Sequence, residues 1–495
     1  MRIFFLILSL YFCFENNLIS GITNIENDRL ILDNASLELY GDHSYKRISL
    51  INSSTLYIKF SALSANGWGS LELTADTIYI DGTSMINGKG KGGVTEGLSS
   101  SALYGSGGSY GGLGGRSGFS ASVQSTAFGD NKNLYDLSQG EKGANGYPDG
   151  SYFSGLGGYG GGKLILNCTV FTLNGIINLS GENGQDCIVS SSKVGGGGGG
   201  AGGGCGIIAK NFSGSGSIYA IGGNGGNGNG DSATRTNYGG GGGAGGRVII
   251  AYNYLSFNTN NIFINGGTGG NSTNAVDGQP GENGSLHITK IPDSPVIISP
   301  ADNGDSLNPP VFKFKALAND SDKLYYKIEL SDNNFISYTV FNQYTNQIGW
   351  NKNNYESGET AVFTLPYTLE SGKIYKWRVY AFDGSVFSEP SEIYSFKCGN
   401  SVSYKITPGE NNNEPKILTL NNDGINDYVK FNVDTTENFK IIIYNIYGEK
   451  IKELSINQNE WDGKDSVGNY VESGAYIVQI QIGNKISSAL VNVIK

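Results

Sequence analysis

An ion-binding motif is the clearest chemical candidate in this chain of 495 residues. Asn421, Asp423 and Asp427 stand at short spacing around a glycine. Calcium takes six to eight oxygen ligands, and alternating Asn and Asp side chains at a tight turn can supply several of them. An Asx-rich turn without an ion accounts for the same residues, so calcium and an ion-free turn both stay open. Asp462 and Asp465 could join the site, but their spacing favours a hairpin turn.

Catalytic chemistry has less support. The only histidines are His43 and His287, and neither is accompanied by a nucleophile on a strained elbow, so we expect a turn position for His43 and a strand position for His287. Polysaccharide hydrolases and lyases need paired acids on one face of neighbouring strands. Residues 91–290 hold only 20 acidic and basic residues, and their acids do not recur at a fixed spacing. We therefore predict no catalytic residue.

Composition limits the partners. The net charge is −10, which opposes binding to the phosphates of nucleic acid. The glycine runs do not resemble phosphate-binding loops, because no Gly-Lys-Ser/Thr follows them. The 30 tyrosines could stack on sugar rings, although half-buried cross-strand pairs are the commoner role of such residues.

A repeated unit in the sequence forms the framework that would position these residues. Of the 77 glycines, 57 lie between Lys91 and Lys290, and two apolar runs followed by glycines recur there at a step of 42 residues. Lys163, Cys205 and Arg247 are assigned equivalent places. A fixed step predicts coils stacked one on the next, with the apolar runs as strands of a parallel β-solenoid.

The glycine clusters between the runs have two interpretations. They are either ordered loops that pack backbone on backbone at one side of the solenoid, or a flexible linker. The regular phase favours order. This region resembles the glycine-rich, right-handed parallel β-helix segments of bacterial surface proteins, through residues 70–93 and 239–255. The resemblance implies an architecture and no particular ligand.

The N-terminus predicts export. Residues 1–20 combine Arg2 with a short apolar run, as a secretory signal does, and no segment is long and apolar enough to span a membrane. Residues 21–290 are then the solenoid. The later cysteines show no metal-ligand spacing. We expect them to be buried and unpaired, with a Cys168–Cys205 bridge between neighbouring coils as the alternative.

Two smaller domains follow. Five prolines within residues 292–310 mark a junction, and residues 291–399 alternate apolar and polar side chains like a β-sandwich. The run from Tyr375 to Asp383 resembles a late strand of a fibronectin type III domain. That resemblance implies a core position for Trp377 and a corner role for Tyr375.

Residues 400–495 carry a further resemblance, through LTLNNDGINDYVKFNV at 418–433 and WDGKDSVGNYVESGAYIVQIQ at 461–481. They are similar to the C-terminal Ig-like domains of gliding-motility and type IX secretion sorting modules, and equally to the Ig-like domain of the flagellar hook-capping protein. The usual proline and glycine before the acidic motif are replaced by Leu420 and Asn422. The resemblance implies a β-sandwich for export or attachment.

These observations predict an all-β chain, with a glycine-rich solenoid followed by two Ig-like β-sandwich domains. We expect a secreted or cell-surface structural or adhesive protein, without enzymatic activity. Its expected partners are an extracellular polysaccharide or a host or neighbouring cell surface, and the secretion machinery through the C-terminal domain. The alternative is a carbohydrate-active β-helix enzyme with accessory modules.

Overall fold

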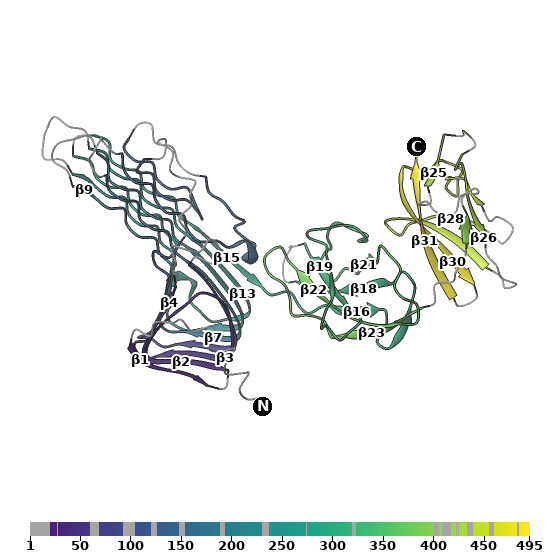
Figure 1. The fold of residues 1–495 in the computed structure, drawn as a ribbon, viewed down its shortest axis with the longest axis horizontal. Helices are drawn as coiled ribbons and strands as arrows, with labels where there is room; N and C mark the ends of the chain where they lie inside the picture. Colours follow the sequence, from purple (N-terminus) through teal and green to yellow (C-terminus); the bar gives the residue numbers. More distant parts are fainter. Residues whose placement is uncertain are drawn as a thin grey trace, which may run out of the picture. The chain divides into compact units, whose positions relative to one another are not determined.

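The regular secondary structure of the described residues is almost entirely β-strand, and the chain divides into two compact units, Met1–Ile291 and Pro292–Lys495 (Figure 1). The structure is a computed structural model. It describes residues 20–26, 28–59, 69–92, 104–119, 126–147, 154–188, 194–229, 237–273, 275–318, 323–399, 405–407, 417–421, 423, 425–432, 439–454, 460–482 and 485–495. The predicted signal at residues 1–20 lies outside these residues except for its last position. Asn422 also lies outside them. No helix of the described part is long and apolar enough to cross a membrane.

One large sheet organises the first unit. Its hydrogen-bonded order is β14-β11-β8-β6-β4-β2-β3-β5-β7-β10-β13-β15, and these neighbours all pair in parallel. Its strands are β2 (Arg29–Leu39), β3 (Gly41–Ile51), β4 (Thr55–Ile58), β5 (Ser70–Ile80), β6 (Met85–Asn87), β7 (Lys163–Leu173), β8 (Ile176–Asn178), β10 (Gly204–Ser213), β11 (Ser217–Tyr219), β13 (Arg247–Leu255), β14 (Ile262–Phe263) and β15 (Ser285–Lys290). The prediction of an all-β chain with a large parallel sheet is confirmed.

The sheet consists of two stacks. The first stack is β3, β5, β7, β10, β13 and β15, and the second stack is β4, β6, β8, β11 and β14. Each later coil gives one strand to each stack, and β2 pairs with both β3 and β4. At the N-terminal end β1 (Ser20–Glu26) pairs antiparallel with β2, which covers that edge of the sheet.

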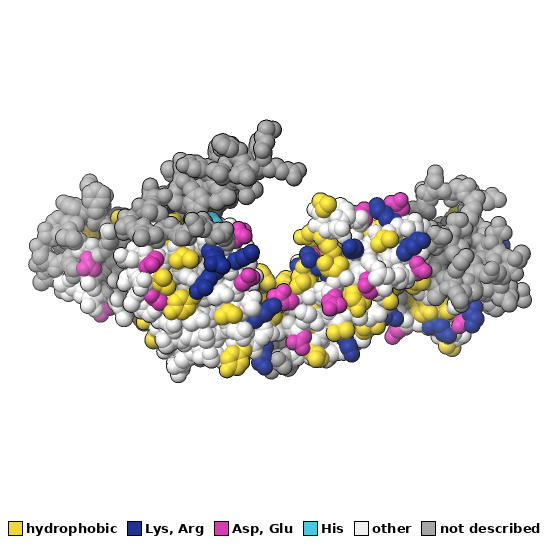
Figure 2. Space-filling view, turned by 90° about the horizontal axis from the view of Figure 1, so that it is seen from below, with side chains coloured by type: hydrophobic (Ala, Val, Ile, Leu, Met, Phe, Trp, Pro, Cys, Tyr) yellow, Lys and Arg dark blue, Asp and Glu magenta, His cyan; other side chains and the backbone are white. Residues whose placement is uncertain are grey.

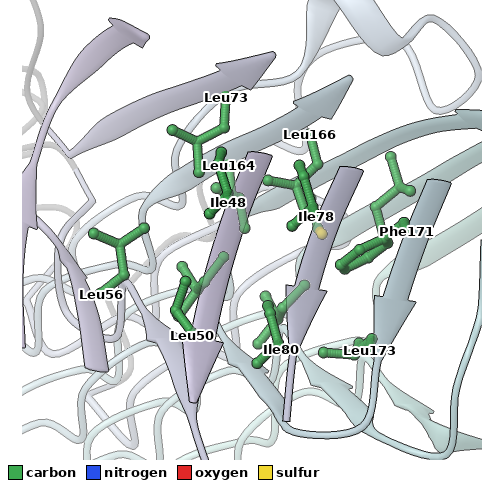
Figure 3. Close-up of a cluster of buried hydrophobic side chains, with 14 of the residues drawn as sticks. Ile48, Leu50, Leu56, Leu73, Ile78, Ile80, Leu164, Leu166, Phe171 and Leu173 are labelled. Carbon is green, nitrogen blue, oxygen red and sulfur yellow. The ribbon is translucent and has the colours of Figure 1, made fainter. Parts of the chain in front are cut away.

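The strands form where apolar and polar residues alternate. In β5 the side chains of Leu71 and Leu73 are fully buried, whereas Thr74 and Asp76 are exposed. The inward side chains fill the space between the stacks, as Figure 3 shows for Leu56 and its neighbours. Burying each such side chain stabilises the fold by roughly 1.5–3 kcal/mol. The inward positions therefore hold successive coils together.

The register corrects the predicted repeat. Gly204, and not Cys205, pairs with Arg247, and Cys205 pairs with Leu164. The spacing is also less even than 42, because coil-to-coil hydrogen bonds join residues 41 apart in one place and 44 apart in another. Short insertions at the turns absorb the difference. In-register stacking survives, with the rings of Phe171 and Phe212 4.9 Å apart.

Residues 296–398 form two sheets. The three-stranded sheet contains β16 (Val296–Ser299), β18 (Val311–Lys315) and β21 (Ala361–Thr364). The five-stranded sheet contains β17 (Gly304–Ser306), β23 (Tyr394–Cys398), β22 (Ile374–Phe382), β19 (Tyr325–Ser331) and β20 (Thr339–Asn342). Trp377 is fully buried between the sheets beside Phe312, at 4.7 Å between ring centroids, so its predicted core position is confirmed. The hydroxyl of Tyr375 accepts from the backbone N–H of Glu370 at 3.3 Å.

The C-terminal residues form a second pair of sheets. One contains β24 (Lys405–Thr407), β26 (Val429–Asn432) and β29 (Glu460–Trp461). The other contains β25 (Ile417–Thr419), β31 (Lys485–Ile494), β30 (Gly474–Ile482), β27 (Phe439–Asn445) and β28 (Lys450–Leu454). Trp461 and Val478 come from different sheets and share one buried cluster, so the two sheets face each other around a common core.

Candidate functional site

The glycine-rich segments form an ordered lattice beside the two stacks, which we call the glycine lattice. It contains residues 105–118, 140–146, 155–161, 181–187, 195–203, 222–228, 239–246, 266–271 and 278–284. From the second stack, each coil runs out through one segment and returns through another to the first stack. In Figure 1 these segments are the unlabelled lines that run from the strands toward β9 (Cys187–Ile188). The prediction that the glycine clusters are ordered and pack backbone on backbone is confirmed.

Hydrogen bonds in the lattice follow a period of three. The backbone N–H groups of three consecutive glycines donate to three different neighbouring segments. These bonds are Gly197 to the Gln185 carbonyl at 2.9 Å, Gly198 to the Ala144 carbonyl at 2.8 Å, and Gly199 to the Gly241 carbonyl at 2.9 Å. Such a pattern fits an extended chain with three residues per turn and no internal hydrogen bonds, like polyproline II. Each segment is therefore stabilised only by its neighbours.

Most glycines of the lattice are required because neighbouring backbones approach each other closely, and not because these positions need a positive φ. A Cβ atom on Gly197 would lie 2.1 Å from the Leu156 carbonyl oxygen, and one on Gly243 would lie 2.0 Å from the Gly200 carbonyl oxygen. No side chain fits at these distances, because the obstructing atoms belong to the backbone. The long glycine runs are thus a packing requirement of the lattice.

A buried arginine attaches the insert 104–147 to the stacks. Arg247 donates to the backbone carbonyls of Phe128 at 2.8 Å and Tyr110 at 3.2 Å, and its guanidinium lies 5.4 Å from the centre of the Tyr110 ring. Leu134 and Leu137 of the insert share a buried cluster with Ile165 of β7 and Ile249 of β13. Lys163 and Arg247 were predicted to hold equivalent places in the repeat. At Arg247 this place serves to hold the insert against the stacks.

The outer face of the lattice consists of Asn183, Asp186, Asn224, Asn227, Thr268 and Asn271. Asn183 Oδ1 accepts the backbone N–H of Asn224 at 2.9 Å, and Asn224 Oδ1 accepts that of Thr268 at 3.0 Å. Asn227 Oδ1 likewise accepts the backbone N–H of Asn271 at 2.8 Å. The side chains at 183, 186, 224 and 227 thus each satisfy an outward backbone donor of the next coil, which closes the lattice toward water.

This outer face is also a regular polar surface. Rows of side chains recur every three residues, or roughly 9 Å at ~3.1 Å per residue. Coils follow at about 4.8 Å, the spacing of hydrogen-bonded strands. At its base the half-buried rings of Tyr219 and Phe263 stack at 4.9 Å between centroids, with their planes 11° apart. Amide groups beside flat rings are chemistry suited to sugars.

The structure brings three charged residues together on the first stack. Asp42 pairs with Glu72, and Lys163 lies on the next strand. Burial and the negative charge of Asp42 raise the pKa of Glu72, while Lys163 opposes that shift. The prediction that the acidic residues do not recur at a fixed spacing applies to residues 91–290. Asp42 and Glu72 lie outside that range. Figure 2 shows mostly uncharged surface on the visible face of residues 1–291.

The predicted ion-binding residues fall in one loop, between β25 and β26. Asp423 Oδ2 accepts from Asn421 Nδ2 at 2.7 Å, and Asp423 Oδ1 accepts from the backbone N–H of Ile425 at 2.8 Å. Asp427 is half-buried at the end of the same loop. Among the described residues no group of three or more His, Cys, Asp or Glu side chains is placed to hold a metal ion. Calcium stays a prediction.

The other aspartates of this region have local partners. Asp465 Oδ1 accepts from the backbone N–H groups of Val467 and Asn469, both at 2.9 Å, which is the predicted turn. Asp462 lies within 3.3 Å of the ammonium groups of Lys452 and Lys464. These two aspartates therefore shape and stabilise the turn.

Two further predictions are corrected. His43 lies within β3 and not in a turn, with Nε2 3.0 Å from the Tyr40 carbonyl oxygen. Cys168 pairs with Ala209 and is therefore displaced from Cys205, which excludes the alternative bridge. Cys168, Cys187, Cys205 and Cys398 are all buried and free, as the favoured interpretation predicted.

Comparison with known proteins bears on the C-terminal sheets. Residues 412–491 match the model of the CHU_C type IX secretion signal domain. By this match the stretch is similar to a secretion sorting domain, and we call it the sorting module. The match indicates export to the cell surface or the extracellular space, and it holds although Leu420 and Asn422 replace the usual proline and glycine. A comparison with curated proteins finds no match.

Solved structures give weak likenesses. Dimeric latent PorU from Porphyromonas gingivalis is 12% identical with a TM-score of 0.18, over 44% of this chain and 22% of that one. The chicken CNTN1 FN1–FN3 domains are 13% identical with a TM-score of 0.16, over 41% of this chain and 66% of that one. A two-domain fibronectin type III segment of chicken tenascin is 10% identical with a TM-score of 0.15, over 41% of this chain and 98% of that one. The chain thus spans about a fifth of PorU, and at these scores the likenesses carry no argument.

Proposed function

We propose that this protein is a non-enzymatic structural or adhesive component of the bacterial cell surface. The sorting module supports delivery to the surface, with the secretion machinery as the partner of that module. The glycine lattice is the observation that carries the structural role. Its backbone donors are satisfied by neighbouring segments, so the coils form a stiff body from residues that carry almost no reactive side chains.

The outer face is our candidate for adhesion to a polysaccharide. Its rows of amides repeat from coil to coil, and the Tyr219–Phe263 stack joins two of these coils, so several weak contacts can add along one polymer chain. Residues 291–399 then act as a fibronectin-like spacer. The Tyr375 hydroxyl bond to Glu370 supports that assignment, because a corner tyrosine of such sandwiches bonds backbone a few residues upstream.

A pull-down of the full chain on insoluble polysaccharides tests adhesion. We expect Tyr219→Ala combined with Phe263→Ala to reduce the bound fraction, because both stacked rings are removed. Tyr254→Ala is the matched control, since Tyr254 is exposed on the first stack, away from the outer face. Equal binding by wild type and the double variant would contradict the assignment of this face.

The second candidate is a carbohydrate-active enzyme, favoured by the Asp42–Glu72–Lys163 arrangement. A carboxyl group with a raised pKa beside a second carboxyl group is the pairing that glycoside hydrolysis uses. Turnover of the same polysaccharides by wild type and Glu72→Gln separates the proposals. Release of reducing ends by wild type that Glu72→Gln abolishes would establish the enzyme and overturn the non-enzymatic proposal.

A further inference from the structure

A buried carboxylate lies on the outer face of the five-stranded sheet in residues 296–398. Glu329 of β19 is only 4% exposed, although it points away from the core between the two sheets. Its Oε2 accepts from Arg378 Nε at 2.7 Å and from the Tyr380 hydroxyl at 3.2 Å, and its Oε1 lies 3.3 Å from Lys327 Nζ. We call Lys327, Glu329, Arg378 and Tyr380 the charged cluster.

The charged cluster has an excess positive charge. Two cations surround one carboxylate, so the group as a whole carries +1. The Lys327 ammonium lies 3.9 Å from the centre of the Tyr380 ring, and the Arg378 guanidinium lies 4.6 Å from that of Phe335. Aromatic faces attract cations and hold them in place. Both cations are therefore positioned before any ligand arrives.

Arg378 keeps donors available for a ligand. Its hydrogen bond to Glu329 uses Nε, and the two terminal Nη groups make no hydrogen bond to the rest of the described chain. The Arg378 side chain is 26% exposed, so part of it is open to solvent. A guanidinium presents paired donors that match the two oxygens of a carboxylate. The open side of the cluster thus fits an anionic group.

The surroundings favour a sugar as the carrier of that anion. Tyr338 is 49% exposed, and its ring centroid lies 6.2 Å from that of Phe335, the ring that the Arg378 guanidinium faces. Tyr344 is 45% exposed and follows β20 by two residues in the chain. Asn342, the last residue of β20, pairs with Lys327. Exposed tyrosine rings can stack on pyranose rings. Figure 2 shows acidic, basic and hydrophobic side chains intermingled on the visible face of residues 292–495.

We propose that the charged cluster, with Tyr338, binds the carboxylate of a uronic acid in an acidic polysaccharide. The Arg378 Nη groups and Lys327 hold the carboxylate, and Tyr338 stacks on the sugar ring. The polysaccharide class rests on the proposed adhesive function, but the site is independent of the outer face of the glycine lattice. The chain's net charge of −10 opposes general attraction to polyanions, so such binding must be local.

Affinity electrophoresis of the full chain in polygalacturonate gels tests this site. We expect wild type to be retarded, and Lys327→Gln and Tyr338→Ala each to weaken binding about tenfold, the loss for one charge-assisted or stacking contact. Added salt should weaken wild-type binding as well. Lys313→Gln is the matched control, because Lys313 is exposed on the three-stranded sheet. Both Lys327→Gln and Arg378→Gln leave Glu329 with one cation fewer, but Lys327→Gln keeps the 2.7 Å hydrogen bond from Arg378 Nε to Glu329 and so disturbs the cluster less.

The outcomes are separable. Unchanged binding by Lys327→Gln and Tyr338→Ala, in variants with wild-type circular dichroism, would overturn the proposal. So would equal binding of polyglutamate, since the ligand would then be an acidic peptide. A wild type that binds insoluble neutral polysaccharides but not polygalacturonate overturns this site and leaves the adhesive function standing. Loss of polygalacturonate binding only in the cluster variants supports the site, whatever the outer-face variants do.

Discussion

At the scale of single residues, the lattice tolerates only glycine where two backbones meet. Gly197→Ala should destabilise the first unit by about 1–3 kcal/mol, because its Cβ would meet the Leu156 carbonyl oxygen at 2.1 Å. Calorimetry of the full chain measures the effect. Gly82→Ala is the control, since the nearest atom to its Cβ is 3.9 Å away. Equal midpoints for the two variants would contradict the packing described here.

The cysteines give a residue-scale test of burial. Burial raises the pKa of the Cys168 and Cys205 thiols to about 12. The reactive thiolate is therefore scarce at pH 8, and its fraction grows only as the pH approaches the raised pKa. We expect a thiol reagent to leave both cysteines unmodified in the native chain and to label both in denaturant. Rapid native labelling at pH 8 would show that the stacks are open.

At the scale of elements, the outer face should hold neighbouring coils together. Asn224→Ala removes the acceptor of the Thr268 N–H, a loss of about 1 kcal/mol. Hydrogen exchange should accelerate at Thr268 and its neighbours and stay unchanged in β7. Asn253→Ala, at an exposed position of β13, is the control. Exchange at Thr268 that is equally fast in wild type would mean that the hydrogen bond does not form in solution.

The repeat made many strands predictable from the sequence. In the insert, where the sequence has no repeat, the structure could not be predicted. The apolar runs at 248–251 and 262–264 fall in or beside β13 and β14, because alternation and glycine spacing repeat there. The insert has no such period. Its partners are distant, as in the contact of Arg247 with the Tyr110 carbonyl across 137 residues. Spacing alone could not place it.

The candidate sites were predictable to different degrees. Asn and Asp recur three residues apart at 183 and 186, and Asn again at 224 and 227, which is the signal that would have shown the outer face. Alternation places Glu329 on the outer side of its strand. Its burial depends on Arg378 and Tyr380, which lie 49 and 51 residues further along the chain. No local pattern encodes that contact.

At the scale of the whole molecule, the proposed function combines a structural scaffold with a secretion signal. Residues 412–491 match a type IX secretion signal domain, and the glycine lattice supplies a body built on backbone hydrogen bonds. The many hydrogen bonds between neighbouring segments support the stability of this body. Export and stability are the two properties that a surface scaffold requires.

Cell fractionation of the full chain and of a truncation ending at Cys398 tests this account most directly. Both variants keep the two stacks and the glycine lattice, and only one keeps the sorting module. We predict that the full chain is exposed to added protease at the cell surface, whereas the truncated chain stays inside and protected. Equal surface exposure of the two would contradict the role of the sorting module, and with it the account of this protein as a scaffold addressed to the surface by its C-terminus.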